Sequence, residues 1–157
     1  MTTTLFPVPA AVRDAGLLFA RVLLGVVLVA QGWQKLSGGV PAVAQGFTKM
    51  GVPLPGAAAW FATLVELVGG VLLILGALTP VVALLVAMDM AGAWLFAHLG
   101  HGPFVAKGGW ELVVLIGSLA VVIALVGPGR ASVDALIASR RAVPDTRPSS
   151  TKTHAAV

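Results

Sequence analysis

Each of the four long apolar segments of this sequence carries an ionisable residue within it, namely Arg21, Glu66, Asp89 and Glu111. A charged side chain at the centre of a membrane helix costs about 2.5–3.5 kcal/mol on insertion scales. Such residues must therefore face the protein interior, pair with an opposite charge, or carry a proton. This pattern indicates either an ion pair that fixes helix packing or a polar site for a small molecule or a proton.

The expected depths of Arg21, Glu66 and Asp89 would bring these three side chains together. At about 1.5 Å rise per residue, Arg21 lies roughly 10 Å and Asp89 roughly 14 Å from the same membrane face, with Glu66 near mid-depth. One guanidinium can reach either acid but cannot neutralise both. We therefore predict an Arg21–Glu66 or Arg21–Asp89 pair within a candidate intramembrane polar site, and we assign no catalytic residue.

A second polar cluster is expected at the opposite membrane face, where three helix ends and two loops meet. One interpretation is ordinary interface polarity, flanked by tryptophan anchors. The alternative is a shallow site in which Lys35 and a histidine bind an anionic or quinone-like head group. The candidate residues of this outer-face site are Gln31, Lys35, His98, His101 and Glu111.

Metal and thiol chemistry have little support in the sequence. His98 and His101 could offer two ligands to one metal, but no third ligand beyond Glu111 is evident, so we predict no metal site. The chain has no cysteine, which excludes disulfides, a thiol nucleophile and a cysteine-bound iron–sulfur cluster. Any redox chemistry would need a bound cofactor, for which a quinone is the candidate, or a partner chain.

The elements that would position these residues are membrane helices. Only 10% of the 157 residues are charged, against about 25% in soluble domains. A crossing needs about 20 apolar residues, and segments 14–36, 57–77, 80–98 and 109–127 approach or meet that length. We predict an all-α integral membrane protein with four transmembrane helices in a bundle. Helical spacing of Val43, Phe47 and Met50 predicts a short interfacial helix between the first two.

Stripes of small residues indicate which helix faces pack together. In the first segment Arg21 shares a face with Gly25, Leu28, Gly32 and Lys35. In the second, Glu66 shares a face with Ala59, Ala62, Gly70 and Leu73. Because small residues let membrane helices approach closely, we expect the ionisable residues to face the bundle interior.

The segments outside the bundle carry most of the basic residues. We expect a lead at 1–13, the membrane domain at 14–129, and a basic, partly disordered tail at 130–157 that begins with a surface helix at 132–142. Thr79 is expected to cap the third helix and Pro80 to start it. The positive-inside rule favours a multi-pass protein with both termini in the cytoplasm. The net charge of +4 therefore indicates a membrane flank and no nucleic-acid partner.

The order and spacing of several short motifs resemble the DoxX family of small bacterial membrane proteins. The resemblance covers roughly residues 16–134. It begins with Arg21-Val22-Leu23-Leu24-Gly25 and Gly32-Trp33-Gln34-Lys35-Leu36, continues through Gly51-Val52-Pro53 and Glu66-Leu67-Val68-Gly69-Gly70, and ends with Gly108-Gly109-Trp110-Glu111, Gly127-Pro128-Gly129 and Ser132-Val133-Asp134.

This resemblance implies a protein of the bacterial inner membrane, similar to the DoxD-type subunit of thiosulfate:quinone oxidoreductases. It implies an oxidoreductase, or a subunit of a redox complex with partner proteins, acting near the quinone pool or in sulfur or oxidative-stress metabolism. Two alternatives stay open. One is a small-solute or proton permease, which with four helices would need a homo-oligomer, and the other is a non-catalytic membrane scaffold for redox partners.

Overall fold

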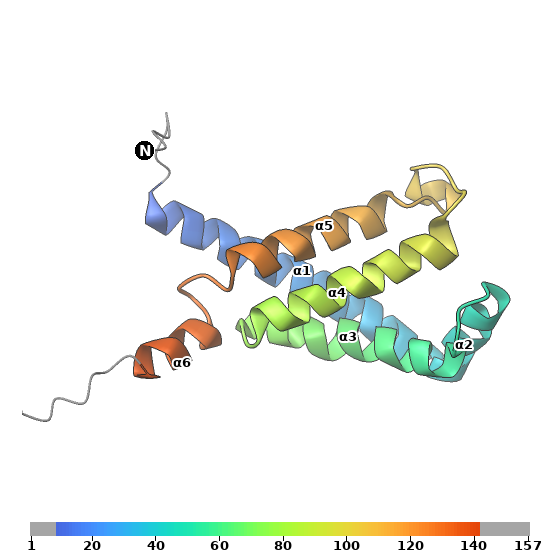
Figure 1. The fold of residues 1–157 in the computed structure, drawn as a ribbon, viewed down its shortest axis with the longest axis horizontal. Coiled ribbons are helices and arrows are strands. Elements are labelled where there is room, and N and C mark those ends of the chain that lie inside the picture. The colour runs from blue at the N-terminus through green and yellow to red at the C-terminus, as the bar shows by residue number, and fades with distance from the viewer. Residues whose placement is uncertain (1–8, 142–157) are drawn as a thin grey trace, which may run out of the picture.

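The computed structural model describes residues 9–141, and within this range every regular element is a helix. The long helices are α1 (Ala10–Gly38), α3 (Pro55–Leu75), α4 (Thr79–Ala93) and α5 (Glu111–Val126). The short ones are α2 (Val40–Lys49), the π-helical turn η1 (Trp94–His98), the 3-10 turn η2 (Val105–Lys107) and α6 (Val133–Arg141). The long helices run side by side, with α2 at one end of the bundle and α6 at the other (Figure 1).

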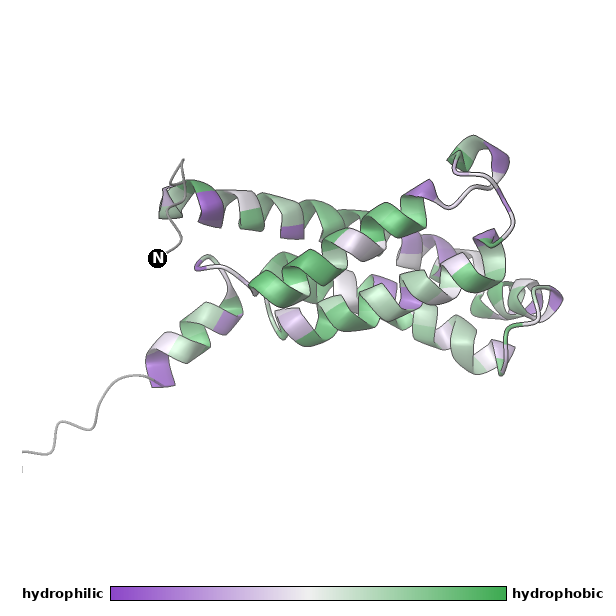
Figure 2. Ribbon diagram, turned by 45° about the horizontal axis from the view of Figure 1, so that its top comes forward, coloured by the Kyte–Doolittle hydropathy of each residue, from purple (hydrophilic) through white to green (hydrophobic). Residues whose placement is uncertain are grey.

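The chain is a membrane protein by the length and hydropathy of its helices. Three of them are long and apolar enough to cross a bilayer, namely α1, α3, and α4 continued through η1 (Thr79–His98). Hydrophobic residues dominate the bundle, while hydrophilic ones gather mostly at its ends (Figure 2). The fourth predicted crossing, at 109–127, is the 16-residue helix α5. Its crossing, and the interfacial position of α2, stay predictions.

The helix ends follow local backbone chemistry. Pro55 and Pro80 stand in the first turns of α3 and α4, where a missing N–H costs nothing. Gly76 ends α3 with a left-handed backbone at φ 69°. The surface helix predicted at 132–142 is α6. The lead before residue 9 and the tail after 141 lie outside the described residues.

Two glycines set the closest helix contact, which joins α1 to α3. A Cβ on Gly25 would lie 2.6 Å from the carbonyl oxygen of Gly70, and one on Gly32 would lie 2.5 Å from the amide nitrogen of Leu67. The two backbones therefore touch, as small-residue stripes in lipid allow. The buried faces of both helices include the residues of the predicted stripes, apart from the partly exposed Lys35. These contacts also show that α1 and α3 are antiparallel.

Helix α4 joins the second close pair, with α5. Both pairs meet in one hydrophobic core made of fully buried aliphatic side chains, among them Leu28 of α1, Leu73 of α3, Val86 of α4 and Ile123 of α5. Helix α3 packs less extensively against α4 than against α1. Helix α2 covers one end of α3. We call this looser contact between α3 and α4 the α3–α4 seam.

Substituting Gly25 with alanine should destabilise the bundle by about 1–3 kcal/mol, because a methyl group there overlaps backbone atoms that cannot move aside cheaply. Gly16→Ala is the matched control on the same helix, since nothing lies within 4 Å of its Cβ position. The control should be neutral or slightly stabilising through helix propensity. Thermal unfolding in detergent measures both changes. Equal melting temperatures for the two variants would contradict the close approach.

Candidate functional site

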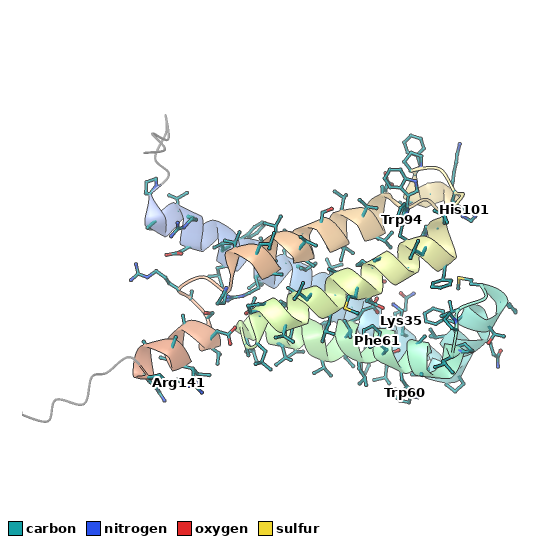
Figure 3. All side chains as sticks on the ribbon, in the orientation of Figure 1. Lys35, Trp60, Phe61, Trp94, His101 and Arg141 are labelled. Carbon is teal, nitrogen blue, oxygen red and sulfur yellow. The ribbon has the colours of Figure 1, made fainter. Side chains whose placement is uncertain are left out.

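A cavity of about 310 Å³ lies between α3, α4 with η1, and α2, beside the end of α1. We call it the Lys35 cavity. Its polar side chains are Lys35 of α1, Glu66 of α3 and Asp89 of α4. Its apolar walls include aromatic and methionine side chains, namely Phe47, Met50, Phe61, Met88 and Phe96. Lys35 and Phe61 are near one another in the view of Figure 3, on the side of the bundle toward α2.

An ion pair forms the polar floor of this cavity. The ammonium of Lys35 donates to the Oε2 atom of Glu66. The Glu66 side chain is only 4% exposed, whereas that of Lys35 is 25% exposed. The pair follows from the helix register, because Gly32 rests on Leu67 and Lys35 lies one turn further along the same face of α1. A buried carboxylate of this kind requires a partner.

Asp89 brings a second carboxyl group to the same cavity. It lies within electrostatic range of both Glu66 and Lys35. Among residues 9–141 no ion pair joins Asp89 to a basic side chain. The cavity therefore holds two acids and one ammonium. Any further anion would meet an uncompensated negative charge, so the site suits a neutral hydrogen-bonding group, a cation or a proton.

The walls of the cavity continue onto the outer surface of the bundle. Phe61 is 41% exposed and Met88 64% exposed, on α3 and α4 respectively. These two helices flank the looser seam of the bundle. The cavity is thus bordered by the surface that a bilayer would cover. A molecule dissolved in the lipid could reach Lys35 and Glu66 through this seam.

Arg21 lies at the opposite end of the bundle, so the predicted Arg21–Glu66 or Arg21–Asp89 pair is wrong. Its guanidinium donates to the carbonyl oxygen of Pro128 and, at 2.6 Å, to that of Ala131. The reason is the antiparallel register. With Gly25 opposite Gly70, Arg21 and Glu66 lie about 12 Å or more apart along the helix axis. The predicted intramembrane site is therefore divided, with Glu66 and Asp89 at the cavity and Arg21 elsewhere.

Near Arg21, Asp134 of α6 is hydrogen-bonded to the turn between α3 and α4. We call this set of hydrogen bonds the Asp134 latch. The carboxylate of Asp134 accepts hydrogen bonds from the amides of Leu78 and Thr79, both at 2.8 Å. The Asp134 amide donates to Gly76 at 3.0 Å. Asp134, and not Thr79, therefore caps α4. Leu78, whose amide donates to this carboxylate, has a left-handed backbone at φ 52°.

The electrostatics of the latch favour an ionised Asp134. Partial burial would raise the pKa of this carboxyl, but the amides of Thr79 and Leu78, with the nearby Arg21 charge, hold that pKa below its usual range. Ser132 completes the local structure as the cap of α6, with its hydroxyl oxygen accepting the Ala135 amide at 3.1 Å. The predicted Gly-Pro-Gly and Ser-Val-Asp motifs thus have a structural role.

The residues of the predicted outer-face site do not form one cluster. Lys35 turns into the cavity, while the Nδ1 atom of His98 hydrogen-bonds the Gly108 carbonyl at 2.7 Å. Glu111 accepts the Val105 amide at 2.7 Å and so orders its own loop. Gln31 is partly buried on α1, and His101 is exposed in the loop seen in Figure 3. Within residues 9–141 no three potential metal ligands converge.

The sequence model of the DoxX family matches residues 16–99. The chain belongs to the DoxX family. The match includes α2, α3, α4 and η1 entirely and most of α1, so all three polar residues of the Lys35 cavity lie within the DoxX region. Helices α5 and α6 fall outside it. No curated protein and no solved structure matches the chain.

The observed site combines residues from both predicted sites. Lys35, assigned to the outer face, joins Glu66 and Asp89, assigned to mid-membrane. The aromatic and methionine walls were not predicted. One signal for Lys35 was present, since it lies on the same stripe as Gly25 and Gly32. The walls come from α2 and η1 as well as from α3 and α4, and how these elements meet depends on tertiary packing.

Removing the Lys35 ammonium should destabilise the bundle more than removing the whole ion pair. Lys35→Met leaves the buried Glu66 carboxylate beside Asp89 without a countercharge, which costs about 3–5 kcal/mol. Lys35→Met/Glu66→Met replaces the pair by apolar side chains of similar length and should recover most of that loss. Unfolding in detergent, with Lys107→Met as a surface control, measures this. A double variant as unstable as the single one would argue against the buried pair.

The Asp134 latch should make stability depend on acid pH. A folded-state pKa below the unfolded value means that the contribution is complete above about pH 5 and is lost as pH falls through the folded pKa. Asp134→Asn should therefore lower the free energy of unfolding by about 1–3 kcal/mol at pH 7 and by much less at the acid end. Asp14→Asn is the control, because Asp14 meets Arg130 only at 4.0 Å. A pH-independent difference would refute the latch.

Proposed function

We propose that this DoxX protein is a subunit of a membrane redox complex and binds a quinone in the Lys35 cavity. One observation carries the proposal, which is the combination of an ion pair and a second carboxyl with an apolar wall that borders the lipid. A quinone has the matching shape, with a polar ring and an apolar chain. The cavity volume of about 310 Å³ is at the lower end of the range for small-molecule sites.

The side chains of the cavity would divide the work of binding. The Lys35 ammonium can donate a hydrogen bond to a ring carbonyl while it stays paired with Glu66. The Asp89 carboxyl can give or accept a proton at a second oxygen. Phe61 and Phe96 can contact the ring, and Met88 lies where the apolar tail would leave toward the lipid. A bound quinone would supply the electron and proton chemistry that these side chains lack.

A partner protein is part of this proposal. The chain has no cysteine, so it offers no thiol or cysteine-bound iron–sulfur relay for electrons. The donor or acceptor would therefore be a separate redox protein. Sulfur or oxidative-stress metabolism, which the family resemblance implied, is one setting for such a complex.

The membrane topology that we propose has four crossings in a bacterial inner membrane, with both termini in the cytoplasm. Two contacts support α5 as the fourth. Its first residue, Glu111, bonds the loop that follows η1, and Pro128, just beyond its end, accepts from Arg21 near the α3–α4 turn. Helix α5 therefore extends from one end of the bundle to the other. Its 16 residues span about 24 Å, and flanking Trp110 and Gly127 can add to that length.

The permease alternative has less support. Between the Lys35 cavity and the Arg21 end, the described helices are filled by the buried core of Leu28, Leu73 and Val86. A single copy of residues 9–141 therefore offers no continuous polar path. The scaffold alternative leaves the lipid-bordered Lys35 cavity without a role.

Quinone titration tests the proposal. The purified protein should bind decyl-ubiquinone or a short-chain menaquinone saturably, as followed by tryptophan fluorescence. Asp89→Asn should weaken binding about tenfold, which corresponds to one hydrogen bond with a charged group. Asp89 has no ion-pair partner among the described residues, so this variant should fold normally.

Glu111→Gln is the matched control, because it also removes a carboxylate but outside the cavity. It should bind both quinones as the wild type does. No saturable binding to either quinone, or an equal loss in the Glu111 variant, would count against a quinone site at the Lys35 cavity.

A further inference from the structure

Helix α6 is held in a fixed place at the end of the bundle. The Asp134 carboxylate caps the turn between two candidate membrane helices, and the Asp134 amide bonds Gly76. The Ser132 hydroxyl closes the first turn of α6. Because a turn between two spans lies at the membrane surface, α6 starts at that surface (Figure 1).

One face of α6 is apolar and exposed. Val133, Leu136 and Ile137 follow the spacing of a single helix face and are 37%, 54% and 45% exposed. Leu78, on the turn that α6 touches, is 62% exposed. Apolar side chains are also exposed on the two helices that this turn joins, where Leu75 is 54% and Val81 57% exposed.

Arginines complete the α6 face. Arg140 lies one turn after Leu136 on the same side, and Arg141 borders a groove that Leu78, Ile137 and Asp134 also line. Arg141 lies at the end of α6 farther from the bundle in Figure 3. Residues 130–141 hold three arginines and one acid, and both carboxylate oxygens of that acid, Asp134, already accept backbone amides. The net charge of this surface is positive.

We propose that α6 binds anionic phospholipid, with its apolar face in the acyl boundary and Arg140 and Arg141 on the phosphate groups. An exposed apolar face that joins the membrane surface and ends in basic residues is typical of an interfacial helix. Long arginine side chains can lie along the apolar layer while their guanidinium groups reach the head groups. The occupant of the α6 groove is then a lipid head group and its first acyl carbons.

Native mass spectrometry of the full chain tests this binding. The protein is titrated in detergent with phosphatidylglycerol or phosphatidylcholine, and retained lipids are counted. The wild type should retain phosphatidylglycerol preferentially. Arg140→Gln/Arg141→Gln should lose at least about fivefold in that preference, since each basic residue near an anionic surface adds a contribution of that order. Both side chains are exposed, so the fold should persist.

Lys49→Gln/Lys107→Gln is the matched control, with the same loss of charge at the opposite end of the bundle. It should keep the preference of the wild type. Equal retention of the two lipids by the wild type, or an equal loss in the control, would overturn the proposal.

Hydrogen exchange in nanodiscs gives a second readout. The α6 amides should exchange more slowly with phosphatidylglycerol than with phosphatidylcholine, and this difference should disappear in the arginine variant. If an acidic protein covers this face instead, α6 will exchange equally in both lipids, and the lipid proposal is wrong. Neither readout uses quinone binding, so the lipid proposal is tested separately from the proposed function.

Discussion

The backbone contact between α1 and α3 determines most of the remaining structure. Gly25 against Gly70, and Gly32 against Leu67, fix both the distance and the register of these helices. A shift by one helical turn would separate Lys35 from Glu66 and leave a buried carboxylate alone. The same register carries Arg21 past the end of α3, to Gly76 and the α6 segment. One steric constraint thus distributes the intramembrane charges between two ends of the bundle.

The two ends differ in how fully their charges are satisfied. At the Asp134 latch, backbone carbonyls accept from the Arg21 guanidinium and backbone amides donate to the Asp134 carboxylate, although the Nε atom of Arg21 and the Thr79 hydroxyl are buried there without a partner. The Lys35 cavity holds one acid more than it holds bases. Helices α3 and α4 beside it pack less extensively against each other than α1 and α3 do, and its walls include phenylalanine and adaptable methionine side chains. An end whose charged groups are bound by the backbone suits stability. An end with surplus charge and looser packing suits a ligand.

Periodicity predicted much of this fold, because the helical faces of α1 and α3 are determined by local spacing alone. The predictions failed where register was needed. Depth arithmetic placed Arg21 near Glu66, since it assumed helices that begin at equal levels, whereas glycine contacts set the actual offset. Thr79 resembled a cap because its competitor, Asp134, lies 55 residues away in sequence. The cavity walls, which α2 and η1 form together with α3 and α4, follow from packing that no local pattern contains.

The left-handed backbone of Leu78 has a consequence for the order of folding. A leucine in this conformation carries a steric cost of about 1–2 kcal/mol, and the group that offsets it, Asp134, is separated from it by 56 residues. During synthesis α3 and α4 leave the ribosome well before that carboxylate exists. The α3–α4 hairpin therefore enters the membrane with an incomplete turn. Its final geometry is acquired only when α6 folds back and brings the Asp134 carboxylate to the turn.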